Sequence, residues 1–154
     1  MNKIKPEQLE QVIGKDLGFS DWYQVDQSLI NNFAKCTNDE QFIHIDEERS
    51  KLESPYGGTI AHGFLSLSLL TKFANESNFS IENTKIVINY GFNKIRFIQP
   101  VRSGEKIRAK FSLLNFSKRK KDEILVTYGV NVELENDQKP VLFAEWLILL
   151  LLNY

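Results

Sequence analysis

The 154-residue chain is predicted to adopt an α+β fold in which one bent antiparallel sheet wraps around a single long helix. Residues 60–74, IAHGFLSLSLLTKFA, are apolar nearly all round, which is typical of a buried helix. Four runs rich in β-branched and aromatic residues follow, separated by the turn-forming stretches PVRSG, SKRKKD and ENDQKP. No repeat or linker interrupts the pattern, so residues 1–154 are expected to form one domain.

The first expected helix begins after Asp26, whose side chain can accept hydrogen bonds from the free N–H groups of a first turn. Four apolar residues recur on one face of a 3.6-residue period: Leu29, Ile30, Phe33 and Ala34. The helix is expected to end near Asn38, because asparagine tolerates the left-handed backbone that closes helices. Cys36 lies on this helix near its apolar face, so we interpret it as an inert core residue.

A short second helix is expected over Asp46–Leu52, followed by the loop SPYGGT, which holds one proline and two glycines. After the long helix come the four expected strands: Lys85–Phe97, Glu105–Asn115, Glu123–Glu135 and Val141–Leu152. In the stretch ILVTYGVNVEL, apolar residues alternate with smaller or polar ones, as in a strand with one buried face. The four runs therefore predict an antiparallel meander.

Composition excludes several classes of protein. A net charge of −1 gives no electrostatic attraction to nucleic acid or to an anionic membrane. A single cysteine excludes an internal disulfide framework. The apolar run WLILLLL is far shorter than the roughly 20 residues that a membrane helix needs, and we interpret it as a strand. The start lacks the apolar region of a signal peptide, so a cytoplasmic protein is expected.

Two polar residues suggest acid–base chemistry. The common motifs of serine hydrolases, P-loop proteins, zinc proteases and dinucleotide-binding proteins are absent from the sequence. Two histidines and one cysteine without a known ligand spacing do not indicate a metal site. Asp39 and His44 lie close together in an irregular segment after the first helix, where a rigid scaffold often carries function. They form a candidate proton-transfer pair, although a buried structural histidine and a turn-forming aspartate explain the same residues.

The second histidine, His62, lies near the start of the long helix and is followed by Gly63. The N–H groups of a first helical turn have no partner within the helix. Gly63 has no side chain to shield its N–H, so a carbonyl oxygen could approach it closely. An acid, a base and an oxyanion donor are the groups needed for proton transfer beside a carbonyl. The glycines could equally serve only tight turns and close packing.

The stretches FAKCTNDEQFIHID and GGTIAHGFLSLSLL resemble the motifs of the MaoC-like (R)-specific enoyl-CoA hydratases, most of all their NodN-like branch. The later segment FNKIRFIQPVRSGEKIRA is also similar to this family, so the resemblance extends over about residues 15–150. Two positions differ from the family pattern: Asn38 replaces a frequent glycine and Phe42 a frequent proline. Asparagine is the next-best residue for a positive φ, so the turn should be kept.

The resemblance implies a hot-dog fold, with the sheet wrapped around the helix over residues 60–74. It implies a homodimer joined at the sheet edges, with an acyl-CoA or acyl carrier protein thioester as substrate and with no metal or redox cofactor. The reaction implied is reversible syn hydration of a trans-2-enoyl thioester to the (R)-3-hydroxyacyl thioester. Nucleic acid and membrane partners are not expected.

The resemblance also implies residue roles. Asp39 and His44 would be the catalytic pair, and the N–H of Gly63 would be the oxyanion donor. A hydroxyl on the long helix, from Ser68 or Thr71, would support the catalytic carboxylate. Substrate contacts are expected from a further set of residues: Gln41, Gly58, Thr59, Ile60, His62 and Arg96. Arg96 is a candidate anion contact, whereas the basic stretch Lys118–Lys121 is interpreted as a solvated hairpin tip.

Two other functions compete with the hydratase. One is a hot-dog thioesterase, but such enzymes usually carry a carboxylate on the central helix, and residues 60–74 contain no Asp or Glu. The other is a non-catalytic subunit that binds acyl thioesters, against which the presence of both Asp39 and His44 argues. The sequence does not indicate the acyl chain length or the pathway.

Overall fold

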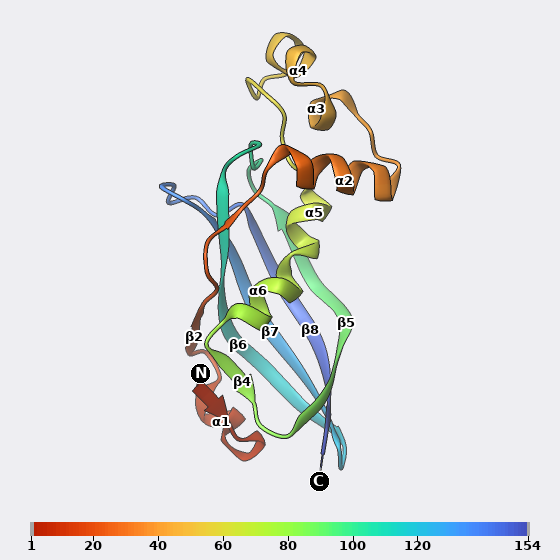
Figure 1. Cartoon of the computed structure of the whole chain (residues 1–154). Coiled ribbons are helices and arrows are strands. Elements are labelled where there is room, and N and C mark those ends of the chain that lie inside the picture. Colours follow the sequence, from red (N-terminus) through yellow and green to blue (C-terminus); the bar gives the residue numbers. More distant parts are fainter. Residues whose placement is uncertain (1, 154) are drawn as a thin grey trace.

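The computed structural model describes residues 2–153, and its main feature is a six-stranded antiparallel sheet curved around two consecutive helices (Figure 1). Four long strands make most of this sheet: β5 (Thr84–Phe97), β6 (Lys106–Lys120), β7 (Glu123–Leu134) and β8 (Leu142–Leu152). Two short strands, β2 (Asp16–Phe19) and β3 (Tyr23–Gln24), pair with β6. The predicted α+β class and the four predicted strands are confirmed.

The strand order is β2-β6-β7-β8-β5, with β3 also beside β6. Strands β6, β7 and β8 form the predicted meander, but β5 pairs with β8 rather than with β6. The prediction of a meander through all four strands is therefore wrong in its first step. The chain passes from β5 across the end of the sheet to β6, which leaves β5 as a 14-residue edge strand.

The helices that the sheet surrounds are α5 (Gly63–Ser68) and α6 (Leu70–Glu76). The predicted helix over residues 60–74 is shifted and divided: Ile60 forms a β-bridge with Arg102, and the helix begins three residues later. Its expected burial on every side is also wrong, because Phe64 is 66% exposed. The stripe Phe64, Ser68, Thr71 and Asn75 faces outward at helical spacing, while Leu70 and Phe73 enter the core.

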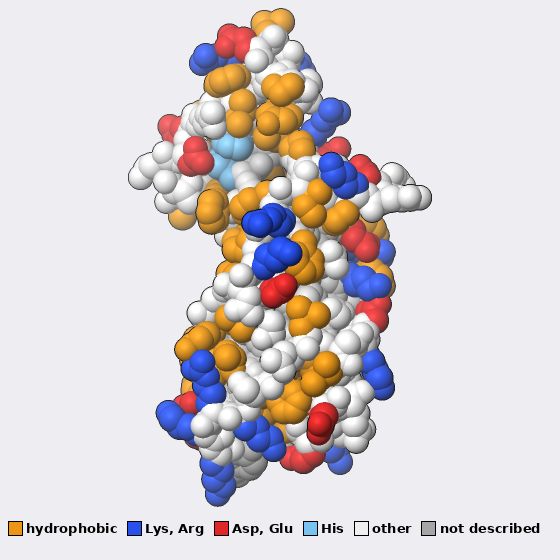
Figure 2. Space-filling view, turned by 180° about the vertical axis from the view of Figure 1, so that it is seen from behind, with side chains coloured by type: hydrophobic (Ala, Val, Ile, Leu, Met, Phe, Trp, Pro, Cys, Tyr) orange, Lys and Arg blue, Asp and Glu red, His pale blue; other side chains and the backbone are white. Residues whose placement is uncertain are grey.

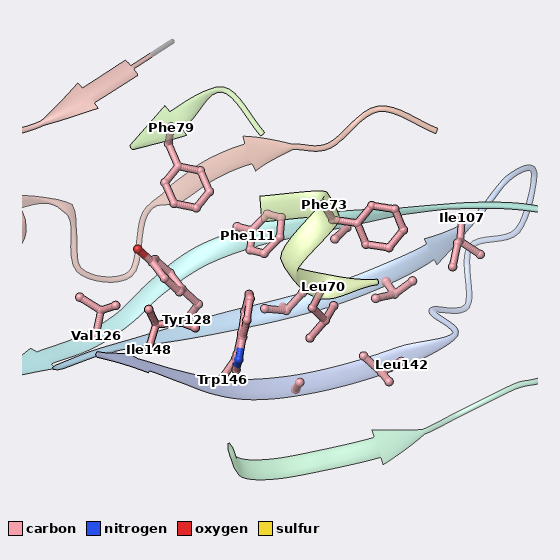
Figure 3. Packing of buried hydrophobic residues seen from close by; sticks show 14 of the residues in the cluster. Leu70, Phe73, Phe79, Ile107, Phe111, Val126, Tyr128, Leu142, Trp146 and Ile148 are labelled. Carbon is pink, nitrogen blue, oxygen red and sulfur yellow. The ribbon is translucent and has the colours of Figure 1, made fainter. Parts of the chain in front are cut away.

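The core lies between these helices and the concave face of the sheet (Figure 3). Phe73 from α6 and Phe111 from β6 are fully buried, and Tyr128 and Trp146 supply large rings from β7 and β8. Phe79 from β4 (Phe79–Ile81) packs edge-on against two of these rings, with centroids 5.5 Å from both Phe111 and Tyr128. The alternation predicted for β7 is confirmed at its ends but not over residues 126–130, which are all buried, whereas in β8 every second residue is buried.

A lobe of three helices extends beyond one end of the sheet (Figure 1). It consists of α2 (Gln27–Thr37), α3 (Phe42–Ile45) and α4 (Glu47–Glu53), and it is called the helical lobe below. The Asp26 side chain caps α2 by accepting the Leu29 N–H at 2.8 Å, and Asp46 caps α4 in the same way at Arg49. The two predicted helices of this region are confirmed, but α3 replaces part of the predicted irregular segment.

The remaining elements were not anticipated. They lie at the N-terminal side of the chain: β1 (Asn2–Ile4), a 3₁₀-helix (Pro6–Gln8) and α1 (Leu9–Val12). Strand β1 pairs in parallel with β4 in a separate two-stranded sheet. Among the residues that the structure describes, no helix is long and apolar enough to cross a membrane. The expectation that the chain forms one domain stays a prediction, as does the cytoplasmic location. Met1 and Tyr154 lie outside the described residues.

The packing of α6 yields a stability prediction. Leu70→Ala should lower the free energy of unfolding by about 2–5 kcal/mol, because Leu70 is 1% exposed and the smaller side chain leaves a cavity. Leu52→Ala is the matched control, since Leu52 is 85% exposed and the same change there should cost at most about 0.5 kcal/mol. Urea unfolding measures both values, and equal losses would contradict the assigned core.

Candidate active site

The end of α2 brings Asp39 to its place. Helix α2 closes at Asn38, which adopts the predicted left-handed backbone with φ 55°. The N–H groups of Asn38 and Asp39 both donate to the carbonyl of Ala34, which fixes the main chain at the turn. Asp39 follows directly, and its side chain is 56% exposed. The carboxylate therefore stands at the surface of a well-bonded turn.

His44 lies on α3 and is 6% exposed. Its ring Nδ1 is 2.7 Å from the carbonyl oxygen of Ile60. A carbonyl only accepts hydrogen bonds, so Nδ1 carries the hydrogen and the neutral ring keeps a free lone pair on Nε2. Burial lowers the pKa of His44 below its ordinary value, and the nearby His62 ring adds to this, although the bond to Ile60 opposes it. The ring is thus prepared to accept a proton at Nε2.

A second set of bonds holds the main chain around His44. The Gln27 side-chain amide donates to the His44 carbonyl at 2.7 Å, and the Thr59 hydroxyl donates to the Gln27 amide oxygen at 2.5 Å. The N–H of Ile60 in turn donates to the carbonyl of Ile43 at 2.9 Å. The segment before α5 is therefore bonded to α3 through both main chain and side chains.

His62 contacts both members of the predicted pair. Its Nε2 lies 2.9 Å from the main-chain carbonyl oxygen of Asp39 and 4.0 Å from the Oδ2 of the same residue. Its ring stacks on the ring of His44, with centroids 3.7 Å apart and planes inclined by 24°. Histidine side chains (pale blue) are visible within the helical lobe in Figure 2, with an acidic side chain beside them. Asp39, His44 and His62 thus form one cluster.

Gly63 begins α5 next to a small pocket. The first N–H groups of a helix have no hydrogen-bond acceptor within the helix. Among residues 2–153, no group accepts a hydrogen bond from the Gly63 N–H. A Cβ at this position would lie 2.9 Å from Cδ1 of Phe97, so only glycine fits without moving that ring. The pocket has a volume of about 290 Å³, and its lining includes several residues: His44, Tyr56, Ile60, Gly63, Ser66 and Phe97.

The cluster is better suited to proton transfer than to metal binding. Asp39, His44 and His62 each offer one possible ligand atom, and these atoms lie within 4.8 Å of one another. One nitrogen of each ring already faces a backbone carbonyl. The remaining lone pairs lie in the planes of two stacked rings, so one ion cannot lie in both planes at the short distance of about 2.0–2.1 Å typical of Zn–N bonds.

The other predicted site residues are more scattered. Gln41 is exposed at the start of α3, and Arg96 is exposed on β5, where its guanidinium donates to the carbonyl of Ile95. The hydroxyl of Thr59 is already bonded to Gln27, while Gly58 lies in the preceding loop. Contact of these four residues with a substrate stays a prediction, whereas Ile60 lines the pocket and holds His44.

The two candidate supporting hydroxyls do not reach Asp39 within this chain. Ser68 donates to the carbonyl of Phe64 at 2.7 Å, one turn earlier in α5. Thr71 lies 3.5 Å from the Asn89 amide and lines a second pocket of about 440 Å³ between α6, β4 and the sheet. The two pockets share no lining residue. A supporting role for either hydroxyl stays a prediction.

Sequence reasoning was wrong about Cys36 and incomplete around the pocket. Cys36 is exposed, because the buried side of α2 passes through Ile30 and Ala34. Tyr56, Ser66 and Phe97 line the pocket but were assigned no role there. Only Tyr56 had a local signal, since it lies in the glycine-containing loop before the histidine motif.

Comparison with known proteins now places the chain. The family model described as a MaoC like domain matches residues 8–136, which is most of the chain. The chain belongs to the MaoC-like domain family. The resemblance inferred from the two motifs is therefore confirmed, and with it the hot-dog fold.

Curated relatives and solved structures extend the match to the full length. Nodulation protein N of Rhizobium meliloti is 40% identical over 153 residues, covering 99% of this chain and 95% of that protein. The 3-hydroxyacyl-thioester dehydratase Z of Mycobacterium tuberculosis is 38% identical, covering 91% of each chain. A monoamine oxidase regulatory protein from an Archaeoglobus species shares the fold, with a TM-score of 0.78 at 24% identity and complete coverage of both chains. The predicted similarity to NodN proteins is confirmed.

The buried ring of His44 makes the stability of this MaoC-like protein depend on pH. Its pKa is lowered in the folded state, so at pH values below about 6.5 the unfolded chain binds a proton that the folded chain resists. The free energy of unfolding should therefore fall as the pH is lowered from 7.5 to 5.5. Urea unfolding at both pH values measures it, and His44→Gln should weaken the dependence. An equal decrease in that variant would contradict the assignment to His44.

Proposed function

We propose that this MaoC-like protein catalyses the reversible addition of water to a trans-2-enoyl thioester, giving the (R)-3-hydroxyacyl thioester. Family membership supports the reaction class, as does the 38% identity to a relative named as a 3-hydroxyacyl-thioester dehydratase. The observation that carries the proposal is the bond from His44 Nδ1 to the Ile60 carbonyl. It leaves an unprotonated Nε2 as a base near the carboxylate of Asp39.

The proposed mechanism uses three groups. A water molecule bound between the Asp39 carboxylate and His44 Nε2 gives one proton to Nε2 while its oxygen bonds to C3 of the substrate. The electrons of the C2–C3 double bond move toward the thioester carbonyl, whose oxygen becomes an enolate and accepts the Gly63 N–H. The proton that His44 Nε2 took from the water then passes from Nε2 to C2 on the same side as the carbonyl re-forms, which gives syn addition and restores the neutral imidazole. The enoyl group would occupy the 290 Å³ pocket, which contains both His44 and Gly63.

The acyl group of the substrate is proposed to be carried as a thioester of coenzyme A or of an acyl carrier protein. The name of the dehydratase relative also refers to an acyl thioester. None of the three steps calls on a metal or redox group, because the proton, the nucleophile and the charge stabilisation come from water, two side chains and one N–H. The Asp39 and His44 side chains are thus assigned to catalysis and Gly63 to charge stabilisation.

A homodimer is also proposed, and the edge strand β5 supports it. This strand carries a row of exposed apolar side chains: Ile86, Val87, Ile88 and Tyr90. A long apolar edge strand with unpaired backbone groups pairs readily with another strand. A second copy of β5 in antiparallel orientation would continue the sheet and cover these side chains. No lysine or proline interrupts residues 86–92 at this edge.

Enzyme activity tests the proposal directly. Wild-type protein mixed with crotonyl-CoA should reduce the absorbance of the enoyl thioester, and chiral analysis should find the (R)-3-hydroxy product. Asp39→Asn and His44→Ala should each lower kcat by about 10²–10⁴, because each removes a group that handles a proton. Asp46→Asn is the matched control, since asparagine caps a helix as well as aspartate and Asp46 caps α4.

Three outcomes would contradict the hydratase. Normal rates in both Asp39→Asn and His44→Ala would remove the pair from the mechanism. Free thiol released from an acyl-CoA would show a thioesterase instead. Saturable binding of several enoyl-CoA chain lengths without turnover would show a non-catalytic binding subunit.

The assembly has its own test. Wild-type protein should have a mass of about twice 17.9 kDa by light scattering during gel filtration. Val87→Lys places a charge on the exposed edge and should shift the mass toward that of one chain. Leu52→Lys, at an exposed site on α4, should leave the mass unchanged. A monomeric wild-type protein would refute the proposed dimer.

A further inference from the structure

The His62 ring is enclosed by three parts of the helical lobe. On one side it meets Phe33 of α2, with ring centroids 5.1 Å apart, and on another it stacks on His44 of α3 at 3.7 Å. At its edge, Nε2 faces the main-chain carbonyl of Asp39. His62 is 3% exposed. Asp39 and His44 are the titratable residues that these contacts bring against the ring.

The contacts define the protonation of this ring. The Asp39 carbonyl can only accept, so Nε2 of His62 carries the hydrogen. Within residues 2–153, the buried Nδ1 has no hydrogen-bond partner. A proton on Nδ1 would create a buried cation without an acceptor, and burying an unpaired charge is costly. The contacts therefore favour the tautomer of the neutral His62 ring that carries its hydrogen on Nε2.

The two stacked rings cannot both be charged at low cost. Two like charges about 3.7 Å apart in a poorly solvated site repel strongly. When His44 holds a proton, His62 must therefore remain neutral beneath it. The two tautomers are complementary, because His44 bonds through Nδ1 and keeps Nε2 free, while His62 bonds through Nε2 and keeps Nδ1 free.

We propose that His62 is the positioning residue of the Asp39–His44 pair, and this proposal rests on the function proposed above. Its Nε2–H holds the main chain at Asp39, and its neutral ring supports the face of the His44 imidazole. One side chain thus sets the relative position of the carboxylate and of the base. The earlier expectation placed His62 in contact with substrate, whereas its buried position and its bonds point to the catalytic pair instead.

The first test reads the tautomers without any substrate. The chain has two histidines, so ¹⁵N-histidine labelling gives two imidazoles, and His62→Gln assigns them. At pH 7.5 we expect His62 to carry its hydrogen on Nε2 and His44 to carry its hydrogen on Nδ1. A charged His62 at pH 7, or one with its hydrogen on Nδ1, would overturn the proposal. This result is obtained even if the protein proves to lack hydratase activity.

The second test separates the two contacts by kinetics. His62→Gln keeps an N–H donor but loses the ring, while His62→Phe keeps a flat ring but loses the donor. Each should lower kcat for enoyl-CoA hydration about 10- to 100-fold through misplacement of the pair, with KM changed less than about threefold. Wild-type values of kcat in both variants would overturn the proposal. If His62→Phe does not fold, His62→Gln and the tautomer measurement still decide.

The pH profile distinguishes positioning from simple loss of stability. His44 acts in its neutral form, so kcat/KM falls as the pH drops through its pKa. The neutral His62 ring covers one face of the His44 ring, and burial lowers the pKa of His44, so replacing His62 by the ringless glutamine should move the acid limb of the profile to higher pH. The structural control is Ser50→Ala, which removes a buried bond of the same lobe, from the Ser50 hydroxyl to the Phe42 carbonyl at 3.0 Å. It should lower Tm and leave the acid limb in place. An unmoved limb in His62→Gln would overturn the proposal.

Discussion

The hydrogen bond between His44 Nδ1 and the Ile60 carbonyl joins two segments that lie 16 residues apart, and the candidate site depends on it. It orients the imidazole, selects the tautomer and connects α3 to the strand-like segment that leads into α5. The Ile60 N–H returns a bond to the carbonyl of Ile43, so the connection is made in both directions. Buried polar groups need hydrogen-bond partners. Here the Ile60 carbonyl is the partner of His44 Nδ1, and this bond sets the tautomer of the imidazole.

The same short segment also fastens the helical lobe to the sheet. Ala61 donates to the carbonyl of Val101 at 2.7 Å, and Ser103 donates to the carbonyl of Thr59 at 3.0 Å. Residues 59–61 therefore bond to the chain leading into β6 on one side and to α3 on the other. The lobe extends beyond the strands (Figure 1), yet these bonds connect its Asp39–His44 pair to the sheet. A rigid sheet can in this way carry a site that lies outside its own core.

The sequence predicted those structural features that depend on residues close together in the chain. The strands follow from alternation and turn residues, the cap from Asp26, and the end of α2 from the left-handed Asn38. The position of β5 beside β8 could not be read in this way, because pairing across the sheet is decided by the whole core. The shifted start of α5 has a similar cause: Ile60 looks helical in the sequence, but a bridge to Arg102 holds it extended.

The candidate site shows the same division. Residue types and spacing singled out Asp39, His44 and Gly63 as candidates, and the family resemblance suggested their roles, which stay predictions. The association of His62 with Asp39 spans 23 residues and depends on how α2, α3 and α5 meet, so no local pattern contained it. Cys36 was misplaced for a simpler reason. On α2 it lies 200° from Ala34 at 100° per residue, which turns it away from the face that packs.

The Asp39 carboxyl group and the His44 ring differ in their exposure to water, and this difference suits their proposed roles. The Asp39 side chain is 56% exposed, so water can solvate its carboxyl group. The His44 imidazole is buried, and burial lowers its pKa and so favours the neutral form that a base needs. In the proposed reaction, a proton taken up by His44 would create a buried positive charge. Burial disfavours that charge, which would favour return of the proton to the substrate. The bond to Ile60 and the Asp39 carboxylate oppose the effect of burial on the His44 pKa, so the ring keeps the capacity to accept a proton that the proposed reaction requires.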